Sequence, residues 1–134
     1  MIKKKIGIID YNAGNIFSII NSLKYLGFKA EIIDNKLQLK NYSYLIFPGV
    51  GSFGHCVENL KKRNFFFKLK QSIVKEQIPT LCICVGMQML GKKSDETKNV
   101  RGLDILEFNV QKIKKNLDIS KLTIIMIFIL TILI

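Results

Sequence analysis

Residues 80–90 read TLCICVGMQML, and this stretch indicates how the polypeptide is built. Residues 80–83 form a short apolar run typical of a buried strand, and residues 85–90 have the pattern of a helix that starts directly behind it. Cys84 stands at the junction, with Gly86 two residues later. A sharp strand-to-helix turn projects its central side chain into a cleft, and the helix N-terminus favours a thiolate there. Cys84 is therefore the candidate nucleophile, and a buried structural cysteine is the alternative.

The segments on either side alternate between strand and helix patterns. Helical spacing covers residues 16–26, where Gly27 is a natural stop, and one helical stretch is expected from about residue 55 to 74. Strands are expected at residues 5–10, 29–33, 44–47 and 107–113. This alternation predicts an α/β fold with a mostly parallel sheet flanked by helices, in which sites form at the carboxyl ends of the strands.

A glycine-rich loop, GVGSFG at residues 49–54, follows the third expected strand. It matches G-x-G-x-x-G, but a dinucleotide site would place that motif after the first strand. Beside a nucleophile turn, such a loop can instead direct backbone N–H groups at a developing oxyanion. An ordinary turn is the simpler alternative.

Composition narrows the functional classes. The 134 residues carry a net charge of +11, but the lysines are scattered and no basic stripe is interleaved with exposed aromatic residues, so we expect no nucleic-acid partner. The cysteines, Cys56, Cys82 and Cys84, are odd in number and lack the spacing of a zinc site. We therefore expect a protein of the reducing cytoplasm with no metal and no cofactor.

Three motifs occur in order along the chain: DYNAGN at residues 10–15, PGVGSFG at residues 48–54 and CVGMQ at residues 84–88. Together they resemble the class I (triad) glutamine amidotransferases, and among them the glutaminase subunits that serve imidazole glycerol phosphate synthesis in histidine biosynthesis. The resemblance covers about residues 6–117 and implies the flavodoxin-like form of the α/β fold.

The resemblance also implies roles for individual residues. Cys84 would attack the side-chain amide of glutamine and form a thioester. The oxyanion would be held by Gly49, Val50 and Gly51 and by the amide of Val85. Contacts to glutamine are implied for Gly51, Gln88 and Glu96, although Glu96 could also be a solvated loop acid. The implied partner is a barrel-type synthase or cyclase subunit, in a heterodimer, to which ammonia passes.

The sequence departs from the family pattern in two ways. Cys82 stands where the family's Gly-x-Cys-x-Gly turn has its first glycine, and the triad histidine and glutamate are absent, since His55 is the only histidine. We therefore expect residues 1–117 to be the N-terminal part of an amidotransferase domain. Residues 118–134 are expected to be an atypical apolar tail arising from a frameshift or truncation, with a membrane anchor disfavoured because the uncharged run from residue 122 is too short to span a bilayer.

Three hypotheses remain open at this level. The chain could belong to a glutaminase subunit for imidazole glycerol phosphate synthesis, and it would then be inactive because the histidine and glutamate of the triad are absent. It could instead supply ammonia for sugar amidation in surface polysaccharide synthesis. It could also be a non-catalytic binding remnant.

Overall fold

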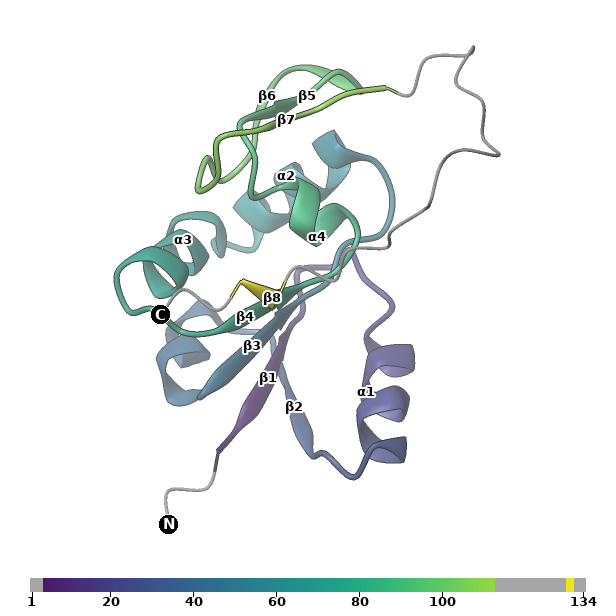
Figure 1. Cartoon of the computed structure of the whole chain (residues 1–134), viewed down its shortest axis with the longest axis vertical. Coiled ribbons are helices and arrows are strands. Elements are labelled where there is room, and N and C mark those ends of the chain that lie inside the picture. Colours follow the sequence, from purple (N-terminus) through teal and green to yellow (C-terminus); the bar gives the residue numbers. More distant parts are fainter. Residues whose placement is uncertain (1–3, 113–129, 132–134) are drawn as a thin grey trace.

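The computed structural model describes residues 4–112 and 130–131. Its elements, drawn in Figure 1, follow one another as β1 (Ile6–Ile9), α1 (Ile16–Tyr25), β2 (Ala30–Ile33), the short 3-10 helix η1 (Lys36–Asn41), β3 (Tyr44–Phe47), α2 (Phe53–Lys62), α3 (Phe66–Val74), β4 (Thr80–Cys82), α4 (Val85–Gln88), β5 (Lys93–Ser94), β6 (Thr97–Arg101), β7 (Asn109–Val110) and β8 (Leu130–Thr131).

The main sheet has the strand order β2-β1-β3-β4-β8. The pairs β1–β2, β1–β3 and β3–β4 are parallel, and only β8 runs antiparallel, against β4. The expected α/β fold with a mostly parallel sheet is thereby confirmed.

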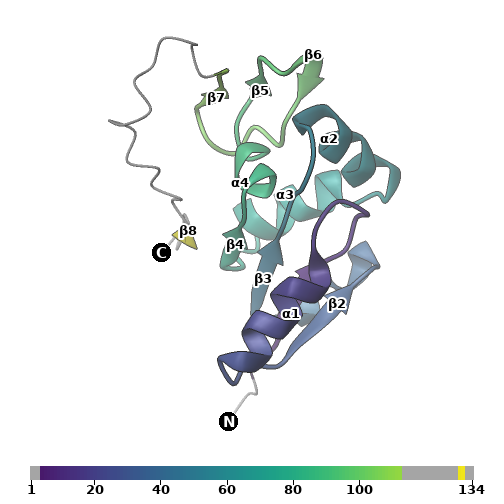
Figure 2. The same ribbon diagram turned by 90° about the vertical axis from the view of Figure 1, so that its right-hand side faces the viewer.

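Helices cover both faces of this sheet. Ile8 and Ile46 point to the face that α1 covers through Ile16. Their neighbours Ile9 and Phe47 point to the opposite face, which α2 and α3 cover, as Figures 1 and 2 show from two directions. The near-continuous apolar strands of the sequence are explained by this burial on both faces.

A small second sheet, of order β6-β5-β7, lies beyond the carboxyl ends of β1, β3 and β4 (Figure 1). It packs on the start of α2, where a Cβ on Gly54 would meet the Thr97 side chain. This sheet forms a wall beside the loops that follow the parallel strands. The sequence patterns did not predict β5, β6 or η1.

The prediction of a single helix over residues 55–74 is wrong, because two helices, α2 and α3, occupy this stretch. Asn64 has a φ of 58°, its amide donates to the carbonyl of Lys61 at 2.8 Å, and the Phe65 amide donates to that of Leu60 at 2.9 Å. This pair of bonds around a left-handed residue is a Schellman motif, which ends α2 and lets α3 begin in a new direction. Asparagine, like aspartate, adopts this conformation more readily than other residues with a side chain.

Other boundaries are shorter than expected. The helix predicted for residues 85–90 is the single turn α4, ending at Gln88. The strand predicted for residues 107–113 is reduced to Asn109–Val110, and Ile113 lies outside the described residues. The expected tail, residues 118–134, also lies outside them except for Leu130–Thr131, so its proposed origin stays a prediction.

Candidate active site

Cys84 occupies a strained turn between β4 and α4. Its backbone has φ 53° and ψ −117°, and the Gly86 amide donates to the Ile83 carbonyl at 3.0 Å. These are the dihedrals and the hydrogen bond of a type II′ turn with Cys84 at its first central position, which glycine usually occupies. The Cys84 side chain is exposed. The turn therefore holds a thiol out of the core at the amino end of α4.

Two glycines bring the loop after β3 against this turn. A Cβ on Gly86 would collide with the backbone carbonyl of Phe47, the last residue of β3. A Cβ on Gly49 would lie 2.5 Å from the Gly86 nitrogen and 2.9 Å from the Val85 carbonyl carbon. Only residues without side chains allow this approach, which sets the glycine-rich loop beside Cys84.

A pocket of about 500 Å³ opens in front of the thiol. It is lined by Gly51, Cys84, Val85, Gln88, Ser94, Asp95, Glu96, Val110, Gln111 and Lys112. The structure thus brings together five of the residues singled out from the sequence, whereas Gly49 and Val50 do not line this pocket. The roles assigned to all seven remain predictions.

The far wall of the pocket was missed by sequence reasoning. Val110, Gln111 and Lys112 reach it because β7 pairs in parallel with β5, and the Asp95 amide donates to the Val110 carbonyl at 3.0 Å. A strand was predicted over residues 107–113, but its pairing with β5, which brings it to Cys84, depends on long-range contacts that no local pattern encodes.

Glu96 is fixed at the start of α2. Its Oε2 accepts a hydrogen bond of 2.8 Å from the amide of Phe53, the first residue of that helix. A carboxylate at a helix N-terminus is favoured by the helix dipole and satisfies an otherwise unpaired amide. Among the described residues, Oε1 of Glu96 has no hydrogen-bond partner, so this oxygen can accept a bond from a ligand in the pocket.

Backbone donors are also available beside the thiol. Within the described part of the chain, the amides of Val50, Gly51 and Val85 donate to no protein acceptor. Gly51 has a φ of 109°, which a residue with a side chain rarely adopts. Gly51 and Val85 line the pocket together with Cys84 and therefore offer it N–H groups without a protein acceptor, the chemistry that an anionic intermediate requires.

The other two thiols are buried. Cys82 is 2% exposed, and burial raises its pKa to about 12. Its side chain packs in the core and its φ is not positive, so a glycine is not needed at this position. Cys56 is fully buried, and burial raises its pKa as well. Cys84 is thus the one cysteine of the three that reagents can reach.

His55 does not line the pocket. It is exposed in the first turn of α2, and its Nε2 lies 3.1 Å from Nδ2 of Asn59. The Asn59 amide in turn donates to the Asn12 carbonyl at 3.2 Å. His55 therefore belongs to a surface network rather than to the thiol.

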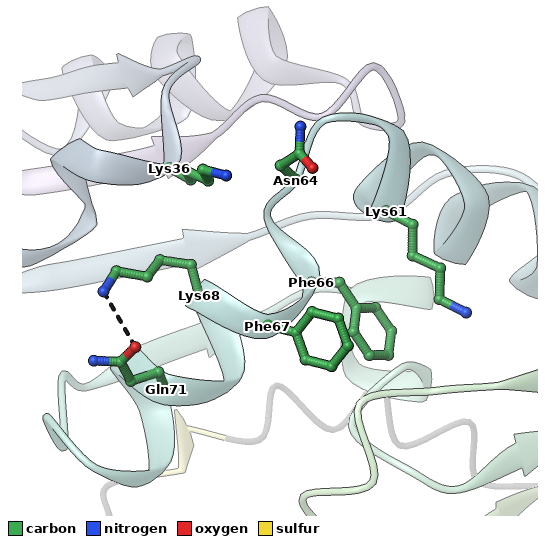
Figure 3. A pocket seen from close by; sticks show the side chains of 7 residues that line it. All are labelled: Lys36, Lys61, Asn64, Phe66, Phe67, Lys68 and Gln71. Atoms are coloured by element: carbon green, nitrogen blue, oxygen red, sulfur yellow. Dashed lines mark hydrogen bonds between the residues drawn. The ribbon is translucent and has the colours of Figure 1, made fainter.

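A second hollow, of about 290 Å³, lies between η1 and the start of α3. Figure 3 shows that the ammonium groups of Lys36, Lys61 and Lys68 point away from one another. Lys68 donates to Gln71 at 3.1 Å, and Lys61 lies over the Phe66 ring at 5.0 Å from its centroid. The cations do not converge on a common point, so this hollow is a weaker candidate than the pocket at Cys84.

Within residues 4–112 and 130–131, no three His, Cys, Asp or Glu side chains gather in a way that could bind a metal ion. None of the helices in this part of the chain has the length and apolar character required to cross a membrane.

Comparison with known proteins agrees with this geometry. The chain is 42% identical over 110 residues to "Imidazole glycerol phosphate synthase subunit HisH" of Caldanaerobacter subterraneus, with 82% of this chain and 54% of that protein covered. The protein of the same name from Methanocaldococcus jannaschii is 42% identical over 120 residues, covering 87% and 56%. "Imidazole glycerol phosphate synthase hisHF" of Schizosaccharomyces pombe is 36% identical over 107 residues, covering 80% and 20%.

The chain thus spans about half the length of the bacterial and archaeal relatives. A solved structure described as "Crystal structure of glutamine amidotransferase" superimposes with a TM-score of 0.67 over 80% of this chain and 56% of the other, at 20% identity, which supports the fold alone. The family model "Glutamine amidotransferase class-I" matches residues 7–122, which include the turn at Cys84, the glycine-rich loop and all residues that line the pocket. The chain belongs to the class-I glutamine amidotransferase family.

Proposed function

We propose that this chain carries the glutamine-binding and nucleophilic part of a glutaminase subunit that supplies ammonia for imidazole glycerol phosphate synthesis. The observation that carries the proposal is the exposed Cys84 on its type II′ turn, facing a pocket between free backbone amides and a carboxylate. The names of the relatives support the choice of synthase over sugar amidation.

In the proposed reaction the Cys84 sulfur bonds to the side-chain carbonyl carbon of glutamine. The carbonyl oxygen becomes an oxyanion, which the amides of Gly51 and Val85 stabilise, with Gly49 and Val50 shaping the loop. The carbon–nitrogen bond then breaks, the thiol proton leaves with the amine as ammonia, and a glutamyl thioester remains. Water hydrolyses the thioester to glutamate and restores the thiol.

The pocket suits a free amino acid because it carries both signs of charge. Asp95 and Glu96 provide carboxylates and Lys112 an ammonium group. We assign the free Oε1 of Glu96 to the α-ammonium group of glutamine, and the Gln88 side chain to the polar groups of its backbone. A zwitterion that leaves either charge unpaired in the pocket loses affinity.

Among the described residues, no histidine lines this pocket. His55 is the only histidine of the 134 residues and does not reach the thiol. We therefore expect this polypeptide to bind glutamine and to react at Cys84, but to turn over glutamine several orders of magnitude more slowly than a complete triad. Ammonia would pass to a barrel-type synthase subunit in a cytoplasmic heterodimer.

A glutamine-directed affinity label tests the proposal without requiring turnover. The purified chain is treated with 6-diazo-5-oxo-L-norleucine, and modified residues are located by peptide mass spectrometry. We expect one adduct on Cys84, slowed by L-glutamine and unaffected by D-glutamine. The matched control is Cys84→Ser, which keeps the pocket and removes the thiol.

The decisive comparison is with iodoacetamide, which needs only an accessible thiol. If the diazoketone reacts no faster at Cys84 than at an exposed thiol in a denatured sample, and L-glutamine gives no protection, the pocket does not bind glutamine and the proposal fails.

A further inference from the structure

Two buried side chains lie behind the glycine-rich loop, on the side of α2. The Tyr11 hydroxyl donates a hydrogen bond of 2.6 Å to the Pro48 carbonyl. The Cys56 thiol, from the second turn of α2, donates to the Val50 carbonyl at 3.4 Å. Both side chains are almost completely inaccessible to solvent. Neither was singled out as a site residue from the sequence, and neither lines the pocket.

These two bonds fix two peptide planes of the loop. In a trans peptide the C=O of one residue and the N–H of the next point in opposite directions. The bond to Pro48 therefore turns the Gly49 N–H away from Tyr11, and the bond to Val50 turns the Gly51 N–H away from Cys56. Gly51 is also the residue of this loop that lines the pocket.

Glycine makes such a restraint necessary. A loop with glycine at positions 49 and 51 can rotate its peptide planes at little steric cost, since glycine adopts positive and negative φ almost equally well. Among the described residues, the N–H groups of Gly49 and Gly51, which lie in the same two peptide planes, have no acceptor that would hold them. The two carbonyl contacts are thus the polar restraints on these planes.

Both groups keep their protons, as donors must. Burial raises the pKa of Tyr11 above its ordinary value, with a smaller contribution from the neighbouring Cys56. Burial likewise raises the pKa of Cys56. At neutral pH a phenol and a thiol, not their anions, face the loop.

We propose that Tyr11 and Cys56 are positioning residues that hold the oxyanion-binding amides of the Pro48–Gly51 loop in orientation for attack by Cys84. The inference rests on the proposed glutaminase chemistry. It assigns to Cys56 a role in the reaction through the loop, with no contact to the substrate.

The test compares Tyr11→Phe, Cys56→Ala and Cys56→Ser in the full chain. For each variant the saturating rate of 6-diazo-5-oxo-L-norleucine labelling at Cys84 is measured beside the iodoacetamide rate. Removing one hydrogen bond is expected to lower the saturating rate about tenfold with half-saturation unchanged. Cys56→Ser, which keeps a donor, restores the rate. Tyr42→Phe is the matched control, because it removes only the bond of 3.0 Å from Tyr42 to Glu31.

An NMR measurement separates this inference from the function on which it rests. Carbonyl ¹³C shifts of Pro48 and Val50 report the two hydrogen bonds with no glutamine chemistry, and each is expected to move upfield when its donor is removed. The inference is overturned if the shifts do not move, if labelling stays at the wild-type rate, or if iodoacetamide labelling falls by the same factor. Absence of glutamine-protected labelling in the wild type identifies failure of the proposed function instead.

Discussion

Replacing Cys84 with glycine is expected to stabilise the fold while it abolishes the thiol. Cys84 has φ 53° and ψ −117°, a conformation that costs a residue with a Cβ about 1–3 kcal/mol. Glycine relieves this strain but adds about 0.4–1 kcal/mol of entropy to the unfolded chain. The side chain is exposed, so little apolar burial is lost. The balance favours glycine by about 0.5–2 kcal/mol.

Alanine is the control that isolates the strain, since Cys84→Ala removes the sulfur and keeps the Cβ. The free energy of unfolding of both variants is measured by urea titration with circular dichroism. With an m-value of about 2 kcal/mol/M, the glycine variant should unfold at a urea concentration higher by roughly 0.3–1 M. If the glycine variant is the less stable of the two, the turn is not strained and the reasoning is wrong.

Three further predictions test the close packing at Gly86, the buried thiol of Cys82 and the end of α2 at Asn64. Gly86→Ala should destabilise the chain by about 1–3 kcal/mol, because its methyl group would press on the backbone at Phe47; an unchanged thermal midpoint would contradict the close approach. Unfolding free energy should fall by up to about 1.4 kcal/mol per pH unit above pH 9, because the unfolded Cys82 thiol ionises near pH 9.0 and the folded one near pH 12. Urea titrations from pH 8 to 10.5 measure that slope, which should be shallower in Cys82→Ala. Asn64→Ala should cost about 1 kcal/mol and Asn64→Gly almost nothing, as calorimetry can check, since a left-handed residue ends α2.

Much of the main sheet is predictable because its patterns are local. Residues 44–47 were predicted to be a strand and form β3 with the same bounds, and Gly27 ends α1 with a φ of 80°. The break at Asn64 was missed because asparagine at a helix end is a weaker signal than glycine. The small sheet was predicted only in part. A strand was predicted over residues 107–113, where β7 forms, but β5 is only two residues long and β7 pairs with it through contacts that no local pattern encodes.

Some residues of the candidate site can likewise be predicted from local patterns, and others cannot. Cys84, Gly51 and Val85 lie close to one another because consecutive parallel strands end at one edge of a sheet, which a sequence pattern can indicate. Residues 110–112 reach the pocket only through the parallel pairing of β7. Glu96 was singled out through the family resemblance, and its bond to Phe53 depends on the packing of the β5–β6 hairpin on α2.

The hydrogen bond from the Phe53 amide to Glu96 connects the proposed ligand-binding carboxylate to the loop between β3 and α2. One carboxylate oxygen holds the first amide of α2, and the same helix supplies Cys56 to the Val50 carbonyl. The loop that runs from β3 into α2 is therefore fixed from both directions, by Glu96 at its end and by Tyr11 and Cys56 along its length. A ligand that bonds to the free oxygen of Glu96 sits against the same helix terminus that orients Gly51. Under the proposed function, recognition of glutamine and orientation of the oxyanion-binding amides share one structural element, α2, which a surface loop alone could not hold in place.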